Sequence, residues 1–244
     1  MGESFSQLEE RAKRATTIEE LFCLWRKAHA AEVGEETFPC RRRRKGEKPE
    51  EPNDPDFKKS FCEDGVTSFG RKHSQNQTAD VVFVLKEAHL EETSEVNCAA
   101  QLEKYFWFNQ CDQNDKSYKR YAANLKKAMC ALYGQVQDDV AFGYINLNKR
   151  GGFGKTNSKR LESYVEKYNA FLKKQLELMQ PKTIVFCGCY DGVAEKLFEL
   201  KDKKWKRQPV STMLNGREVT LYYIYHPAYP RFKNSLDIFK NESN

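Results

Sequence analysis

The sequence predicts an α/β protein of three layers, with a four-stranded, mainly parallel sheet between two layers of helices. Four apolar runs of strand length, at 81–85, 140–146, 182–187 and 219–225, alternate with stretches of helical periodicity. Strands that alternate with helices form βαβ units, whose strands are parallel and whose helices cover both faces of the sheet. The 244 residues are enough for one such domain with an appended segment.

The first predicted helix spans residues 16–31. Thr16 with Glu19, or Thr17 with Glu20, has the spacing of a capping box, in which side chains satisfy the first backbone N–H groups of a helix. Apolar residues then recur at helical spacing, at Ile18, Leu21, Phe22, Trp25 and Ala28. A basic, proline-containing stretch follows and predicts a surface loop.

The remaining elements are predicted in order from residue 80 onwards. The run at 81–85 is continuously apolar, as in a parallel strand that is buried on both faces. The clearest helix covers 158–180, because its apolar residues form one stripe and Pro181 stops it. Further helices are predicted at 98–108, 118–132 and 191–200.

Composition limits the class of protein. No stretch approaches the roughly 18 apolar residues of a membrane span, and the N-terminus lacks the apolar core of a signal peptide. The eight cysteines are scattered, as free thiols are in a reducing cytosol, and Cys187-Gly188-Cys189 is too tight for ordinary zinc spacing. We therefore expect a cytoplasmic protein without a metal, with a helical extension at 1–77 and one α/β domain at 78–244.

Two segments concentrate the positive charge of the chain. Residues 149–160 contain five Lys or Arg and no acid, and residues 201–217 contain six against one Asp. Clustered positive charge beside a cleft suits a polyanion such as DNA, although two solvated loops would have the same composition. The candidate phosphate contacts are Lys149, Arg150, Lys155, Lys203, Lys204, Lys206 and Arg207.

One motif resembles a phosphate-binding loop. Gly152-Phe153-Gly154-Lys155-Thr156 precedes a helix, but the P-loop pattern requires a glycine five residues before Gly154, where this chain has Lys149. Without that glycine the tight turn around the phosphates is lost, and a nucleotide triphosphatase is disfavoured.

Polar clusters stand at the ends of three predicted strands. Lys86-Glu87-Ala88-His89 closes the first strand, Asn146-Leu147-Asn148-Lys149-Arg150 ends the second, and His226-Pro227-Ala228-Tyr229-Pro230 follows the fourth. In open parallel sheets, ligands bind outside the carboxyl ends of the strands. We therefore expect a carboxylate, an asparagine and a histidine to meet in one crevice, beside basic residues.

These motifs, in this order, resemble those of the uracil-DNA glycosylase superfamily. The segment 81–89 is similar to its first motif, in the Gly-Glu-Ala-Pro-Gly form, and 145–149 resembles its middle motif. The segment 180–188 resembles its Pro-Lys and third strand, and 225–228 resembles its final His-Pro-Ser/Ala motif. The resemblance implies a uracil-DNA glycosylase-like fold and a monomer that flips a nucleotide out of duplex or single-stranded DNA. It also implies hydrolysis of the N-glycosidic bond without a cofactor.

The reaction needs groups of these kinds. Base removal builds positive charge on the sugar, which a carboxylate such as Glu87 stabilises while it holds the attacking water. A histidine donor such as His226 stabilises the departing base anion. An asparagine such as Asn146 presents a donor and an acceptor to the edge of a flipped base.

The chain also departs from the family pattern. Lys86 replaces the leading glycine of the first motif and His89-Leu90 replace its Pro-Gly, at positions that border the base pocket in the family. Lys86 and Ala88 are therefore candidate base contacts, and His89 is a candidate to share the work of Glu87. Arg150 follows Lys149 where cluster-bearing members have a cysteine, so an iron–sulfur cluster is not expected.

Three functions remain open from the sequence. Some bacterial members of the superfamily excise bulky modified cytosines from phage DNA as an antiviral defence, and the altered first motif makes a modified base the leading substrate. Uracil excision in base-excision repair is the alternative, and a nucleic-acid-binding protein without turnover is a third. Extruding a nucleotide leaves a gap in the stack, and Tyr229 or Arg231 is the candidate to fill it.

Overall fold

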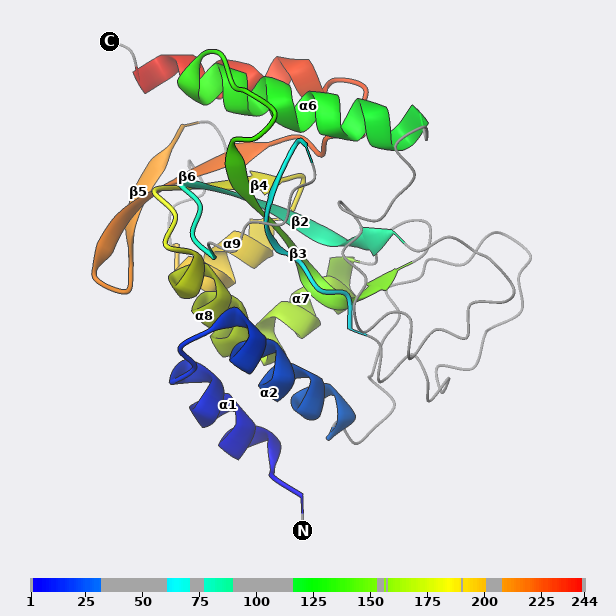
Figure 1. Ribbon diagram of the computed structural model, residues 1–244, viewed down its shortest axis with the longest axis vertical. Coiled ribbons are helices and arrows are strands. Elements are labelled where there is room, and N and C mark those ends of the chain that lie inside the picture. Colours follow the sequence, from blue (N-terminus) through cyan, green and yellow to red (C-terminus); the bar gives the residue numbers. More distant parts are fainter. Residues whose placement is uncertain are drawn as a thin grey trace, which may run out of the picture. The chain divides into compact units, whose positions relative to one another are not determined.

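The computed structural model describes residues 2–31, 61–70, 77–89, 116–152, 156, 158–189, 191–200 and 208–242. Its helices and strands are shown in Figure 1. In chain order they are α1 (Phe5–Lys13), α2 (Ile18–Ala30), β1 (Gly65–Ser68), β2 (Val81–His89), α6 (Lys116–Tyr133), β3 (Ala141–Gly152), α7 (Ser158–Lys167), α8 (Asn169–Met179), β4 (Thr183–Cys187), α9 (Asp191–Phe198), β5 (Val210–Leu214), β6 (Arg217–Ile224) and the 3-10 helix η2 (Phe232–Glu242).

The described strands form one six-stranded mixed sheet in the order β1-β3-β2-β4-β6-β5. β2, β4 and β6 run parallel, whereas β1 pairs with β3 and β5 pairs with β6 in antiparallel register. The predicted α/β class is confirmed, and the four predicted strands are neighbours in the sheet. The predicted number of strands is wrong, because β1 and β5 add an antiparallel strand at each edge.

The central strands are apolar because they are covered on both faces. All five residues of β4 are buried, and so are residues 81–85 of β2. Phe186 of β4 packs on Phe198 of α9, and Tyr222 of β6 packs on Phe239 of η2. Val185 pairs with Tyr222, so Phe186 and Tyr222 lie on opposite faces. α9 and η2 therefore cover opposite faces of this part of the sheet (Figure 1).

The β5–β6 hairpin turns at Asn215-Gly216. Both residues have positive φ, at 48° and 75°. This is the conformation of the two-residue turn that matches the twist of a hairpin, and Asn-Gly is its preferred sequence.

Gly143 of β3 is a point of close contact inside the sheet. A Cβ at this position would lie 2.5 Å from Val82 Cγ2 and 2.5 Å from Met179 Cε. The Met179 side chain can bend away, but the branched Val82 side chain has little freedom.

Gly143→Ala is therefore expected to lower the free energy of unfolding by about 1–3 kcal/mol through overpacking. Urea denaturation measures this change. Adding Val82→Ala makes room for the methyl group, so the double variant should be less destabilised than the two single changes together. Simple additivity of the two changes would contradict this steric account.

The chain divides into two compact units that interleave in sequence. The first contains the described residues of Met1–Asp64, Lys86–Trp107 and Asn146–Leu178, and the second contains those of Gly65–Leu85, Phe108–Ile145 and Met179–Asn244. The predicted boundary between 77 and 78 stays a prediction.

The N-terminal helices belong to the core of the first unit. The Trp25 ring of α2 stacks on Tyr168, and Phe5 of α1 contacts Tyr168 and Phe171. Trp25, one of the apolar residues that predict α2 as a helix, is thus packed against Tyr168 and Phe171.

Most predicted elements are present, with shifted ends. Thr17 caps α2 by accepting a hydrogen bond from the backbone N–H of Glu20, which is the second of the two predicted pairs. The helix predicted at 158–180 is divided at Tyr168 into α7 and α8, and α1 was not predicted. The helix predicted at 98–108 lies outside the described residues. No helix in the described part of the chain is long and apolar enough to cross a membrane.

Candidate functional site

Glu87 lies inside β2 rather than in a loop after it, because the strand continues to His89. Its carboxylate is half-buried and accepts a hydrogen bond from Asn148 Nδ2 at 3.4 Å. Asn148 Oδ1 accepts from the backbone N–H of Arg150 at 3.0 Å, which leaves the amide NH2 to point at Glu87. Asn148 therefore orients the predicted catalytic carboxylate. Asn148 is part of the predicted motif at 146–150, but nothing in the sequence distinguished its role from that of Asn146.

Asn146 is held by its backbone. Its N–H donates to Asp64 Oδ2 at 2.6 Å, and its carbonyl accepts from Lys149 Nζ at 2.8 Å. The residue is only 1% exposed, and its side-chain Oδ1 finds no hydrogen-bond donor among the described residues. A buried carbonyl without a donor is unfavourable by about 1–3 kcal/mol. This oxygen is an acceptor that a donor group on a ligand would satisfy.

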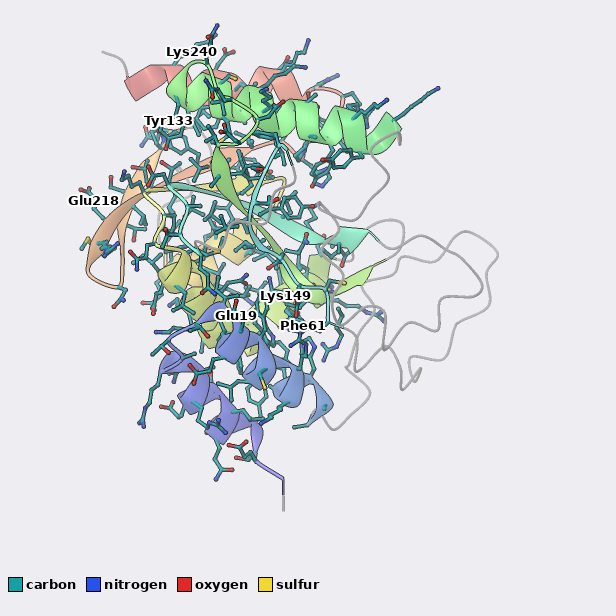
Figure 2. The ribbon with its side chains drawn as sticks, viewed as in Figure 1. Glu19, Phe61, Tyr133, Lys149, Glu218 and Lys240 are labelled. Atoms are coloured by element: carbon teal, nitrogen blue, oxygen red, sulfur yellow. The ribbon has the colours of Figure 1, made fainter. Side chains whose placement is uncertain are left out.

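Lys149 is buried and paired, so its predicted role as a phosphate contact is wrong. Its side chain is fully buried, and Nζ lies 2.7 and 2.6 Å from the two carboxylate oxygens of Asp64. Gln175 Nε2 donates to the same carboxylate at 2.7 Å. In Figure 2, Lys149 is labelled beside Phe61, whose neighbour Cys62 donates its N–H to the Lys149 carbonyl.

The Asp64–Lys149 pair lies in an environment that disfavours charge. Burial raises the pKa of Asp64 and lowers the pKa of Lys149, and the attraction between the two opposes both shifts. The Trp25 ring also lies beside this pair, with its centre 5.3 Å from Lys149 Nζ. The Asp64–Lys149 pair thus has a structural role near the C-terminal end of β3.

Arg150 is buried as well, which contradicts its predicted contact with DNA. It is 1% exposed, and its guanidinium lies 5.6 Å from the centre of the Tyr164 ring and 5.9 Å from that of Tyr168. A guanidinium packed on aromatic rings is stabilised by cation–π attraction. The side chain supports the packing of α7 against β3.

In the second unit, β6 ends at Ile224. Gly188, which follows β4, lies close to the segment that leads from Ile224 to His226. Gly188 has φ 64°, and its N–H donates to the Ile224 carbonyl at 2.8 Å. A Cβ on Gly188 would lie 2.7 Å from His226 Cβ and 2.8 Å from its backbone N. Only glycine permits both the left-handed backbone and this close approach.

Gly188→Ala is expected to destabilise the protein and to displace His226. Gly216→Ala is the matched control, because Gly216 also has positive φ, at 75°, but a Cβ added there would have no atom within 4 Å. The control should show only backbone strain, of about 1–2 kcal/mol. Gly188→Ala should lose about 1–3 kcal/mol more in urea denaturation, and the imidazole signals of His226 should shift in its NMR spectrum. Equal losses would mean that the contact with His226 carries no strain.

The His226 ring is oriented by its own motif. The backbone N–H of Ala228 donates to His226 Nδ1 at 3.2 Å. A neutral imidazole has one N–H, so a ring that accepts at Nδ1 carries its proton at Nε2, and we assign the tautomer from this contact. Nε2 lies 3.4 Å from the Tyr121 hydroxyl. Burial raises the pKa of Tyr121 well above its ordinary value, so this hydroxyl stays protonated. His226 thus presents an N–H donor at Nε2.

Helix α6 holds the next two residues of the motif. Asn124 Nδ2 donates to the Pro227 carbonyl at 2.6 Å, and Arg120 Nη2 donates to the Ala228 carbonyl at 2.7 Å. With Tyr121, these side chains bind three consecutive residues from one face of the helix. Each of these contacts joins positions more than 100 residues apart, and the predicted site included none of the three α6 residues.

The other predicted site residues fall into three groups. Ala88 is buried and Lys86 is half-buried, while the side chain of His89 is not described. Tyr229 and Arg231 are exposed, as a DNA contact requires. The predicted DNA contacts that lie outside the described residues are Lys155, Lys203, Lys204, Lys206 and Arg207.

Among the residues described, no group of three or more His, Cys, Asp or Glu could hold a metal ion.

Glu87 and Asn146 belong to the first unit and His226 to the second. Their predicted convergence in one crevice stays a prediction. Comparison of the sequence with protein-family models and with curated proteins finds no match.

Proposed function

We propose that this protein is a DNA glycosylase that flips out a base and hydrolyses its N-glycosidic bond, and that the base is modified. Plain uracil is the alternative substrate. The observation that carries the proposal is the geometry of His226, whose neutral ring is held with an N–H at Nε2 by the Ala228 N–H.

A neutral donor suits a leaving group that departs as an anion. When the bond between C1′ and the base nitrogen breaks, the electron pair goes to the base, and negative charge develops on its carbonyl oxygen. A fixed N–H donor stabilises that charge without any reorganisation at the moment of reaction. In this proposal, His226 Nε2 takes that role.

The carboxylate of Glu87 takes the complementary role. Asn148 holds one of its oxygens at 3.4 Å, and the half-buried side chain retains access to water. The carboxylate stabilises the positive charge that builds on the sugar and accepts a proton from the attacking water, whose oxygen bonds to C1′.

Asn146 supports recognition of the base. Its Oδ1, buried and without a donor among the described residues, suits an N–H on the pairing edge of a flipped base. Both uracil and cytosine derivatives offer such an N–H. The preference for a modified base rests on Lys86 and His89, which replace the Gly and Pro of the family's first motif.

The test compares two DNA substrates: one that contains uracil and phage DNA that carries hypermodified cytosine. After incubation, alkali-labile sites report excised bases. Breaks only in the phage DNA support the proposal, and breaks only in the uracil DNA support repair of uracil. Retarded DNA without breaks in either substrate overturns the proposal and makes the protein a nucleic-acid binder. Glu87→Gln in parallel excludes a contaminating glycosylase.

A further inference from the structure

Helix α6 carries an unbalanced positive charge. Its 18 residues include five Lys or Arg and no Asp or Glu. Four of these basic residues are exposed and recur at helical spacing along one side, at Lys116, Lys119, Arg120 and Lys127. The opposite side of α6 carries Leu125, Ala128 and Met129, which are buried.

Among the described residues, few acidic side chains compensate the charge on this side of α6. Of the acidic residues in the described part of the chain, Asp138 pairs with α6, and it binds Lys126. Lys127 donates to the neutral amide oxygen of Asn124 at 3.4 Å. The Arg120 guanidinium has five N–H groups, and the Ala228 carbonyl accepts from one of its nitrogens. The side of α6 formed by Lys116, Lys119, Arg120 and Lys127 is called the basic face.

Two exposed tyrosines flank residues 226–228, which α6 holds. Tyr225 is 40% exposed and Tyr229 is 48% exposed, although aromatic rings usually bury most of their surface. Their ring centres are 5.2 Å apart at an angle of 71°, and the Tyr229 N–H donates to the His226 carbonyl at 2.7 Å. The bond from Arg120 to the Ala228 carbonyl joins this aromatic pair to the basic face. In Figure 2, Tyr133 marks the end of α6 and Lys240 lies on η2, which packs beside it.

We infer that the basic face and the Tyr225–Tyr229 pair form a binding surface for single-stranded nucleic acid. The basic face binds the phosphates, and the tyrosines stack on unpaired bases. Lys and Arg side chains interleaved with exposed aromatic rings are how proteins bind single strands. In a duplex the faces of the bases are stacked inside the double helix. A duplex can therefore contact the basic face through its phosphates, but its bases cannot stack on the tyrosines. The inference rests on the proposed function only in taking DNA as the ligand, and it names the unpaired strand as the preferred form of that ligand.

The first test uses salt dependence. The probe is a single-stranded oligonucleotide that contains 2-aminopurine and no uracil or modified cytosine. Each phosphate contact contributes about 0.7 to the slope of log K against log salt concentration on a single strand. The triple variant Lys116→Gln, Lys119→Gln and Lys127→Gln should therefore lower the slope by about 2.

The control removes the same charge elsewhere. Lys13, Lys182 and Lys240 each pair with a carboxylate on the surface, so their replacement by Gln removes three charges that are already compensated. This control triple should keep the slope of the unmodified protein. Equal slopes for the two triple variants would overturn the role of the basic face.

The second test uses the tyrosines. Tyr225→Ala and Tyr229→Ala should each weaken binding of the single strand by about 5- to 150-fold, which is the range for loss of one stacked base. Binding of the matched duplex should change little. Tyr→Phe at either position keeps the π face and should keep both the affinity and the quenching of 2-aminopurine fluorescence. Equal losses on duplex and single strand, or unchanged quenching in the Ala variants, would overturn the stacking role.

These readouts are independent of turnover. An enzyme that excises a base but shows none of these effects overturns the inference and leaves the proposed function standing. Stacking and salt effects in a protein that makes no breaks in either DNA overturn the proposed function and leave the binding surface.

Discussion

Glu87→Gln is expected to bind DNA as the unmodified protein does and to lose at least about 100-fold in turnover. The amide keeps the size of the side chain and can still contact Asn148, but it neither accepts a proton from water nor stabilises a positive sugar. Removal of a general base typically reduces the rate by about 100- to 10,000-fold. Single-turnover excision on whichever DNA proves to be the substrate measures the change, and filter binding measures the affinity.

Glu218→Gln is the matched control for that experiment. Glu218 is exposed on β6, so its replacement makes the same chemical change away from the predicted motifs. Its rate should equal that of the unmodified protein. If Glu87→Gln also retains the full rate, Glu87 has no part in the chemistry and His89 becomes the candidate base.

Lys149→Met is expected to destabilise the protein strongly. The Asp64 carboxylate then remains buried with the Asn146 N–H and Gln175 as donors but without its counter-ion. Removing one partner of a buried pair lowers the free energy of unfolding by about 3–5 kcal/mol, because it leaves an uncompensated charge in the interior. Urea denaturation followed by far-UV circular dichroism measures the loss.

Two further variants separate charge from packing. Asp64→Leu combined with Lys149→Met removes both charges, so the double variant should be more stable than the sum of the two single changes predicts. Lys182→Met breaks the Lys182–Asp80 pair, which is exposed on the surface, and should leave stability nearly unchanged. A Lys149→Met variant as stable as the Lys182→Met variant would contradict the structural role of the buried pair.

The local patterns in the sequence determined the class of the fold. The apolar runs at 81–85, 182–187 and 219–225 became β2, β4 and β6, because a strand covered on both faces must be apolar along its whole length. The Thr17 cap and the apolar stripe of α2 also depend on residues within one or two turns. The β5–β6 hairpin has an equally local signal at Asn215-Gly216, although β5 was not among the predicted strands.

The sequence also singled out Glu87, Asn146 and His226 as the residues that carry chemistry. It did not identify the side chains that orient two of them. Asn148 binds Glu87 across 61 positions, and Tyr121 lies against His226 across 105. Such pairs leave no periodic trace in the chain, because they arise only when separate elements pack together.

Charge was the least predictable property from sequence alone. Lys149 and Arg150 were grouped with the solvated basic residues, yet the tertiary structure buries Lys149 against Asp64, 85 positions away, and Arg150 against two tyrosines. The basic face of α6 was not recognised from the sequence. Its lysines alternate with the apolar residues of the helix, so the segment showed only the pattern of an amphipathic helix. Nothing in the sequence distinguishes a lysine that pairs with a buried carboxylate from one whose charge is solvated by water. Only the packing of distant elements decides between the two.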